Sequence, residues 1–120
     1  MAFEFQLAGA YYRSKLAQAN VLELPVGCRV WLQAEPDNRH DPNAIQVWYI
    51  DPADWHNVDE HFIGYVPAVD CDDVHPYLQD EYEARCVKQG GLKPTISVGY
   101  AWEFETDGET EDESAGELEA

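Results

Sequence analysis

Positively charged residues are scarce in this chain of 120 residues, because seven Lys and Arg stand against 24 Asp and Glu, a formal net charge of −17. Nine of the acids lie from Glu103 onward, and residues 1–102 still carry 15 acids against seven bases. Proteins that coat nucleic acid need a basic patch that releases counterions from phosphates. The charge therefore argues against non-specific DNA coating. It favours recognition of a particular end or shape, or contact with a basic protein partner.

Cysteine is also sparse, and long apolar runs are missing. The three Cys are odd in number and widely spaced, at positions 28, 71 and 86, which excludes a disulfide framework or a zinc knuckle, so we expect reduced, mostly buried thiols. The four His lack the spacing of metal ligands, so we expect no metal and no cofactor. The start of the chain, MAFEFQ, has neither a basic flank nor a continuous apolar stretch. We therefore expect no secretory signal, no spanning helix and a cytoplasmic location.

The common catalytic motifs are missing as well. The chain has no Gly-rich phosphate loop, no nucleophile elbow and no H-E-x-x-H motif. Cys71 is followed by Asp72 and Asp73, whose charges would raise the pKa of the thiol and disfavour a nucleophile. We therefore expect a binding domain and not an enzyme.

Aromatic and β-branched residues, by contrast, are plentiful and fall in short runs. These runs predict six strands, at residues 3–12, 28–34, 44–50, 62–67, 82–87 and 95–102. Residues 13–19 fit one helical turn, residues 51–60 a long acidic loop, and residues 70–81 a short helix with Pro76 in its first turn. The chain is therefore predicted to be mainly β, a small barrel or strongly curved sheet with one or two short helices.

Composition divides the chain in two. Residues 1–103 have the size and apolar content of one domain, whereas residues 104–120 are acidic, bury almost nothing and are predicted to form a disordered tail. Acids recur there at every second residue, which in an extended chain sets charges on one side ~6.7 Å apart. Such spacing fits a DNA mimic or an inhibitor that binds a basic nucleic-acid-processing protein. A solubilising tail, or one that competes with DNA for the domain's own cations, are the other interpretations.

The loop at residues 37–43 concentrates amide, imidazole, carboxylate and guanidinium groups before an aromatic-rich strand. Two interpretations stay open. Its Asp-Pro-Asn turn can be purely structural. Alternatively, Asn38 and Asp41 present acceptors to a hydroxyl or base edge, His40 offers a ring for stacking and Arg39 meets a phosphate. A carboxylate accepts a hydrogen bond from a sugar hydroxyl but repels phosphate.

Three segments in this order resemble the HIRAN domain: LAGAYY at residues 7–12, EPDNRHDPNAIQV at residues 35–47 and FIGYVP at residues 62–67. The resemblance covers roughly Phe5 to Val87, and the ordered combination is more specific than any one motif. It implies an OB-like β-barrel module that captures the 3′-hydroxyl end of single-stranded DNA.

The resemblance also implies which residues form the site. It places Asn38 and Asp41 against the terminal nucleotide, His40 at a stacking position and Tyr65 on a strand that lines the site. Phe5-Gln6 stand where the DNA-binding member has an Arg-Tyr pair, and Ala68 stands where it has Lys, so two phosphate-facing cations are missing. Phosphate contacts would then come from Arg13, Lys15, Arg29 or Arg39, while Asn43 braces the loop. The expected nucleic-acid-binding set is Gln6, Asn38, Arg39, His40, Asp41, Asn43 and Tyr65.

Overall fold

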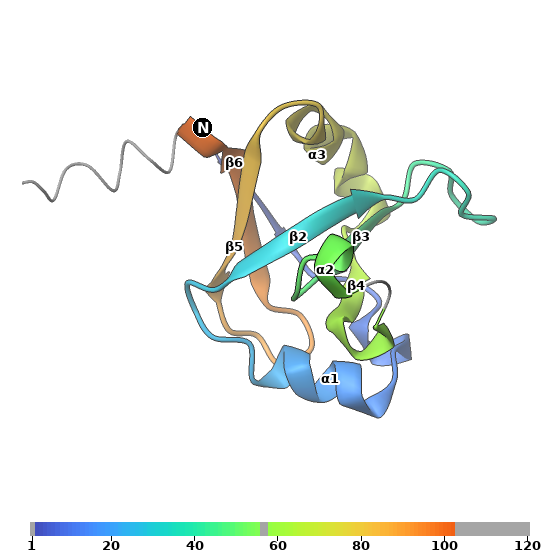
Figure 1. Ribbon diagram of the computed structural model, residues 1–120, viewed down its shortest axis with the longest axis vertical. Helices are drawn as coiled ribbons and strands as arrows, with labels where there is room; N and C mark the ends of the chain where they lie inside the picture. Colours follow the sequence, from blue (N-terminus) through green and yellow to red (C-terminus); the bar gives the residue numbers. More distant parts are fainter. Residues whose placement is uncertain (1, 56–57, 103–120) are drawn as a thin grey trace, which may run out of the picture.

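The computed structural model describes residues 2–55 and 58–102, and in these residues six antiparallel strands form one curled sheet (Figure 1). Along the sheet the strands lie in the order β1-β6-β5-β2-β3-β4. The predicted mainly β fold is confirmed, and the predicted tail at residues 104–120 lies outside the described residues. The strands are β1 (Phe3–Gln6), β2 (Arg29–Ala34), β3 (Ile45–Trp48), β4 (Phe62–Tyr65), β5 (Tyr82–Lys88) and β6 (Thr95–Tyr100).

The two edges of the sheet meet at one residue pair. Ala8, just past β1, forms an antiparallel bridge with Tyr65 of β4, and the N–H of each donates to the carbonyl of the other at 2.8 Å. Gly64 permits this approach, because a Cβ at that position would lie 2.5 Å from the carbonyl oxygen of Ala8. The bridge joins the first strand to the fourth, which gives the curled sheet the form of a small barrel.

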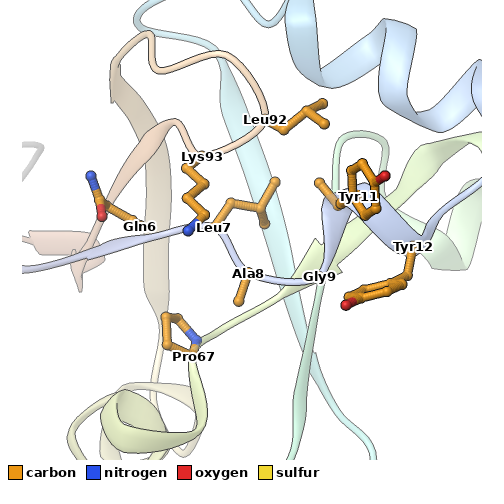
Figure 2. Close-up of a pocket in the computed structure, with 10 residues that line it drawn as sticks. Gln6, Leu7, Ala8, Gly9, Tyr11, Tyr12, Pro67, Leu92 and Lys93 are labelled. Carbon is orange, nitrogen blue, oxygen red and sulfur yellow. The ribbon is translucent and has the colours of Figure 1, made fainter.

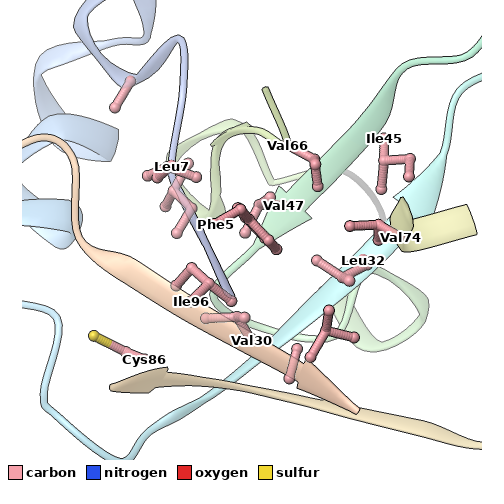
Figure 3. Close-up of a cluster of buried hydrophobic side chains, with 14 of the residues drawn as sticks. Phe5, Leu7, Val30, Leu32, Ile45, Val47, Val66, Val74, Cys86 and Ile96 are labelled. Carbon is pink, nitrogen blue, oxygen red and sulfur yellow. The ribbon is translucent and has the colours of Figure 1, made fainter. Parts of the chain in front are cut away.

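The core lies inside the curl of the sheet (Figure 3). β2 buries Val30 and Leu32 while its neighbours Arg29 and Gln33 are exposed, which is the alternation expected of a strand with one buried face. The other strands also contribute to the core, but not all of them alternate: β6 buries four consecutive residues, from Ile96 to Gly99. The fully buried members of the core include Val21, Leu24, Val30, Ile45, Val47, Ile63, Val74, Ala84, Cys86, Ile96 and Val98.

Two helices of two turns each lie at opposite ends of the barrel (Figure 1). α1 (Lys15–Leu22) is longer than the single turn predicted, because the Oγ of Ser14 caps it by accepting from the N–H of Ala17 at 3.1 Å. α3 (Cys71–Leu78) is shorter than the helix predicted at residues 70–81. The prediction that Pro76 lies in the first turn is wrong, because Pro76 is the sixth residue of the helix, which ends two residues later. No helix of the described chain is long and apolar enough to cross a membrane.

The first predicted strand was too long. It ends at Gln6, because Gly9 adopts a left-handed conformation with φ 76° and the chain then forms a short 3₁₀ helix, η1 (Ala10–Tyr12). The predicted acidic loop likewise holds a helical turn, α2 (Pro52–Trp55), and another 3₁₀ helix, η2 (Asp59–His61). A third, η3 (Ala68–Asp70), leads into α3.

Candidate functional site

The loop between β2 and β3 is built by its own side chains. The N–H of Glu35 donates to the carbonyl of Ala44 at 2.9 Å and closes the base of the loop. Inside it, Oδ1 of Asn38 accepts from the backbone N–H groups of His40 and Asp41, both at 2.9 Å. A carbonyl oxygen has two lone pairs, so this acceptor is already occupied. Asn38 therefore shapes the loop. The oxygen that was expected to accept a hydrogen bond from a ligand instead accepts two from the loop backbone.

Asn43 ties the same loop to α3. Its Nδ2 donates to Oδ1 of Asp72 at 2.8 Å, and Nε2 of His75 lies 2.8 Å from its carbonyl oxygen. A carbonyl only accepts, so this His nitrogen carries the hydrogen. Asp41 completes the turn, because its Oδ1 accepts from the N–H of Asn43 at 2.9 Å. Asn43 thus braces the loop, as the sequence indicated.

A groove of about 360 Å³, here called the end pocket, opens between the loop, β4 and the segment after β1. It brings together four of the seven expected site residues, Asn38, His40, Asp41 and Tyr65, and leaves Arg39 and Asn43 out of its lining. The end pocket is lined by Ala8, Gly9, Asn38, His40, Asp41, Ala44, Tyr65, Val66, Ala68 and Cys71.

Glu35 supports the end pocket from beside it. Its Oε1 accepts from the hydroxyl of Tyr65 at 2.9 Å and from Nδ2 of Asn38 at 3.2 Å. Partial burial acts to raise the pKa of Glu35, but hydrogen bonds from Asn38, Tyr65 and Gln46 outweigh it and hold that pKa below its ordinary value. Burial first, and then the hydrogen bond to Glu35, raise the pKa of Tyr65. At neutral pH the pair is therefore a carboxylate and a protonated phenol.

A second cavity of about 450 Å³, here called the tyrosine pocket, adjoins the end pocket (Figure 2). Ala8 and Gly9 line both, so the two share a wall. Gln6, the fifth expected site residue, lies on one side of the tyrosine pocket, and Tyr11 and Tyr12 lie on the other. These two rings are 73% and 86% exposed, which makes them available for stacking. The remaining lining residues are Leu7, Ala10, Pro67, Leu92 and Lys93.

Two of the cations expected to meet phosphates have other partners. The guanidinium of Arg13 lies 4.0 Å from the centre of the Phe62 ring and pairs with Asp59 at 2.9 Å. Phe62 in turn packs edge-on against Tyr65, with ring centres 5.3 Å apart. Arg13 therefore supports β4. Arg29 lies over the ring of Trp31, 5.2 Å from its centre. Neither Arg13, Arg29 nor Lys15 lines either pocket.

Sequence reasoning missed four residues of this region: Glu35, Tyr11, Tyr12 and Lys93. Glu35 appeared only as the first residue of the segment EPDNRHDPNAIQV and was given no role of its own, although an acid in a loop rich in hydrogen-bond donors can organise that loop as an acceptor. The two Tyr were assigned to a strand. They instead form a 3₁₀ helix after the left-handed Gly9, and the sequence pattern alone does not reveal that Gly9 adopts this conformation.

The described residues hold no group of three or more His, Cys, Asp or Glu that could bind a metal ion. The three thiols are free in the structure, with Cys71 and Cys86 buried and Cys28 half-buried. Burial, the largest influence, raises the pKa of each of them.

The fold and the sequence of this chain are both similar to those of known proteins. A protein from Lactobacillus plantarum has a similar crystal structure, with a TM-score of 0.58 and 19% sequence identity, over 82% of this chain and 95% of that chain. The crystal structure of the HIRAN domain of human HLTF is also similar, with a TM-score of 0.52 and 16% identity, over 88% of this chain and 81% of that chain. No curated protein sequence matches. The family model of the HIRAN domain matches residues 1–106. The chain belongs to the HIRAN domain family.

Proposed function

We propose that this HIRAN domain is a non-catalytic module that binds single-stranded DNA at a free 3′-hydroxyl end, in the end pocket. One observation carries the proposal. Asp41 lines the pocket, its Oδ1 is used by the loop, and its second carboxylate oxygen has no hydrogen-bond partner among the described residues. A carboxylate oxygen in that setting accepts a hydrogen bond from a hydroxyl and repels a phosphate. Family membership supports the same ligand class.

The terminal nucleotide would fit between polar and aromatic groups of the end pocket. Asp41 accepts from the 3′-hydroxyl, and the exposed ring of His40 stacks on the base or sugar. Tyr65, on β4 across the pocket from the loop, presents its hydroxyl oxygen. No step of bond-making or bond-breaking is involved, and the described residues contain no catalytic motif of the kinds sought above.

The tyrosine pocket gives the strand a place to continue. A single strand leaving the end pocket passes the shared wall at Ala8 and Gly9 and meets Tyr11 and Tyr12. A base stacked on an aromatic ring contributes about 1–3 kcal/mol, without sequence preference. Lys93 on the same pocket supplies a cation for a phosphate. Gln6 offers an amide, which can both donate and accept.

Few phosphate contacts are available, and this sets the salt dependence. Lys93 lines the tyrosine pocket, and Arg39 is an exposed residue of the loop that bounds the end pocket, so we count these two cations as phosphate contacts. Each contact to a single strand contributes about −0.7 to the slope of log affinity against log salt concentration. With two contacts we expect a slope of about −1.4. Such binding is modest in affinity and selective for an end, which agrees with an acidic protein.

The test is a fluorescence-anisotropy titration at low salt with two short oligonucleotides that differ only in a 3′-hydroxyl or a 3′-phosphate. We expect binding to the hydroxyl end and at least tenfold weaker binding to the phosphate end. Asp41→Asn keeps the bond from the N–H of Asn43 and removes the charge, and it should reduce this preference. Asp73→Asn, on the exposed side of α3, is the matched control and should preserve it.

Two outcomes would overturn the proposal: equal binding to both ends, or binding to neither. Binding to neither would leave the alternative from the sequence, an acidic domain that contacts a basic nucleic-acid-processing protein. Capture of such a protein by the full chain, in competition with DNA, would then support that alternative.

A further inference from the structure

Most backbone donors around the end pocket are already used by the protein. Tyr65 and Ala8 donate to each other, the N–H of Val66 donates to Ile45 and that of Ala44 to Asp41. The remaining N–H groups donate to acceptors within the loop or at the start of α3. The lining residues whose N–H groups are occupied in this way are Ala8, Asn38, His40, Asp41, Ala44, Tyr65, Val66 and Cys71.

The hydroxyl of Tyr65 has its proton committed as well. An ionised carboxylate only accepts, so in the 2.9 Å contact between Tyr65 and Glu35 the phenol must be the donor. Glu35 has no proton to give back. The Asn38 side chain also donates to the phenol oxygen, so one lone pair of that oxygen is left to accept from a ligand in the pocket, and the hydroxyl cannot donate to that ligand.

We infer that Glu35 determines the ligand specificity of the end pocket, by fixing the hydroxyl of Tyr65 as an acceptor so that the pocket takes a hydroxyl donor and rejects a phosphate. The inference rests on the proposed function and adds a residue that does not itself line the pocket. Asp41 and Tyr65 then present acceptors from two sides, and a 3′-hydroxyl satisfies one of them with its single proton. A terminal phosphate offers only acceptors at neutral pH. It would meet the acceptors of Asp41 and Tyr65, and the carboxylate of Glu35 behind Tyr65 would repel it further.

Neutralising Glu35 should reverse this arrangement. In Glu35→Gln the side-chain amide gains two N–H donors, one of which can donate to the phenol oxygen. The hydroxyl of Tyr65 is then free to turn its proton into the pocket, where it can donate to a phosphate oxygen. We expect the preference for the 3′-hydroxyl over the 3′-phosphate to fall by about tenfold, which corresponds to one hydrogen bond to a charged group.

The experiment compares both oligonucleotides against wild type, Glu35→Gln, Tyr65→Phe and the control Asp73→Asn, with thermal unfolding of each variant as a check of folding. Asp73→Asn removes the charge of an exposed residue that does not line the pocket, so it should change both affinities alike and keep their ratio. Tyr65→Phe keeps the ring and removes the acceptor, so it should weaken binding to the hydroxyl end and, by removing one acceptor that repels phosphate, strengthen binding to the phosphate end.

The outcomes separate the two proposals. A folded Glu35→Gln variant that keeps the wild-type ratio overturns the inference alone. Should Glu35→Gln fail to fold, an unchanged ratio in Tyr65→Phe overturns it in the same way. A wild-type protein that does not distinguish the two ends overturns the proposed function, and the inference falls with it. A reduced ratio in Glu35→Gln with an unchanged ratio in Asp73→Asn supports both.

Discussion

The hydroxyl of Tyr65 and the carboxylate of Glu35 meet at 2.9 Å although 30 residues separate them along the chain. Glu35 opens the loop after β2, and Tyr65 ends β4, so this hydrogen bond joins the loop to the far edge of the sheet. The same Glu35 oxygen also holds Asn38. The shape of the loop and the orientation of the Tyr ring therefore depend on one carboxylate.

Stability should respond to pH through Glu35. Its pKa is lowered by folding from an ordinary value of 4.5, so its contribution is fully present above that pH and is lost as the pH falls through the lowered value. Glu35→Gln should thus be less stable than wild type near neutral pH, and the gap should narrow below 4.5. Urea unfolding at several pH values measures it, and a gap that widens on acidification would contradict the assignment.

Gly64 should be sensitive to the addition of a side chain. In Gly64→Ala the new methyl group would lie 2.5 Å from the carbonyl oxygen of Ala8, so the bridge must open or shift. We expect a loss of about 1–3 kcal/mol in the free energy of unfolding. Gly91→Ala is the control, because Gly91 has φ 62° but open space around it, and its cost should be about 1 kcal/mol. A Gly64→Ala variant as stable as wild type would mean that the bridge tolerates a Cβ.

The link between the loop and α3 can be measured by a double-mutant cycle. Asn43→Ala and Asp72→Ala should couple by about 0.5–1 kcal/mol, because they share a hydrogen bond of 2.8 Å at the protein surface. Asp73→Ala in place of Asp72→Ala should give a coupling near zero. Chemical denaturation of the four proteins of each cycle supplies the values. Similar coupling in both cycles would point to the charge of α3 and not to the hydrogen bond.

The two exposed Tyr should affect binding and not folding. Tyr12 is 86% exposed, so Tyr12→Ala should leave the melting temperature almost unchanged. Its loss should weaken binding of a single strand by about 1–3 kcal/mol if a base stacks there. Leu22→Ala, 55% exposed on α1 and outside both pockets, is the control for a lost apolar surface. An unchanged affinity in Tyr12→Ala would exclude the tyrosine pocket from the binding path.

Much of the fold was predictable from the sequence because its strands have clear physical signals. β3 and β6 are short runs of β-branched and aromatic residues, and turn residues separate the strands. What failed was local. Gly9 was taken as part of a strand, but a left-handed glycine ends it. The helix that follows was underestimated, since the cap at Ser14 strengthens a segment with little periodic pattern.

The site was predictable as a loop but not as a pocket. The residues Asn38, His40 and Asp41 lie close together in sequence, so their proximity needed no tertiary information. Their individual roles did need it, because the same amide oxygen can serve a ligand or the loop backbone, and only the structure places it on two N–H groups. The roles of Glu35 and Lys93 depend on contacts between distant segments, which no local pattern contains.

The bridge between Ala8 and Tyr65 affects how the barrel opens. These two backbone hydrogen bonds alone pair the edges of the described sheet, so they are where the barrel can come apart with the fewest bonds broken. Both residues line the end pocket. A molecule bound in the end pocket would contact both residues that close the barrel, so we expect such binding to slow amide exchange at Ala8 and Tyr65.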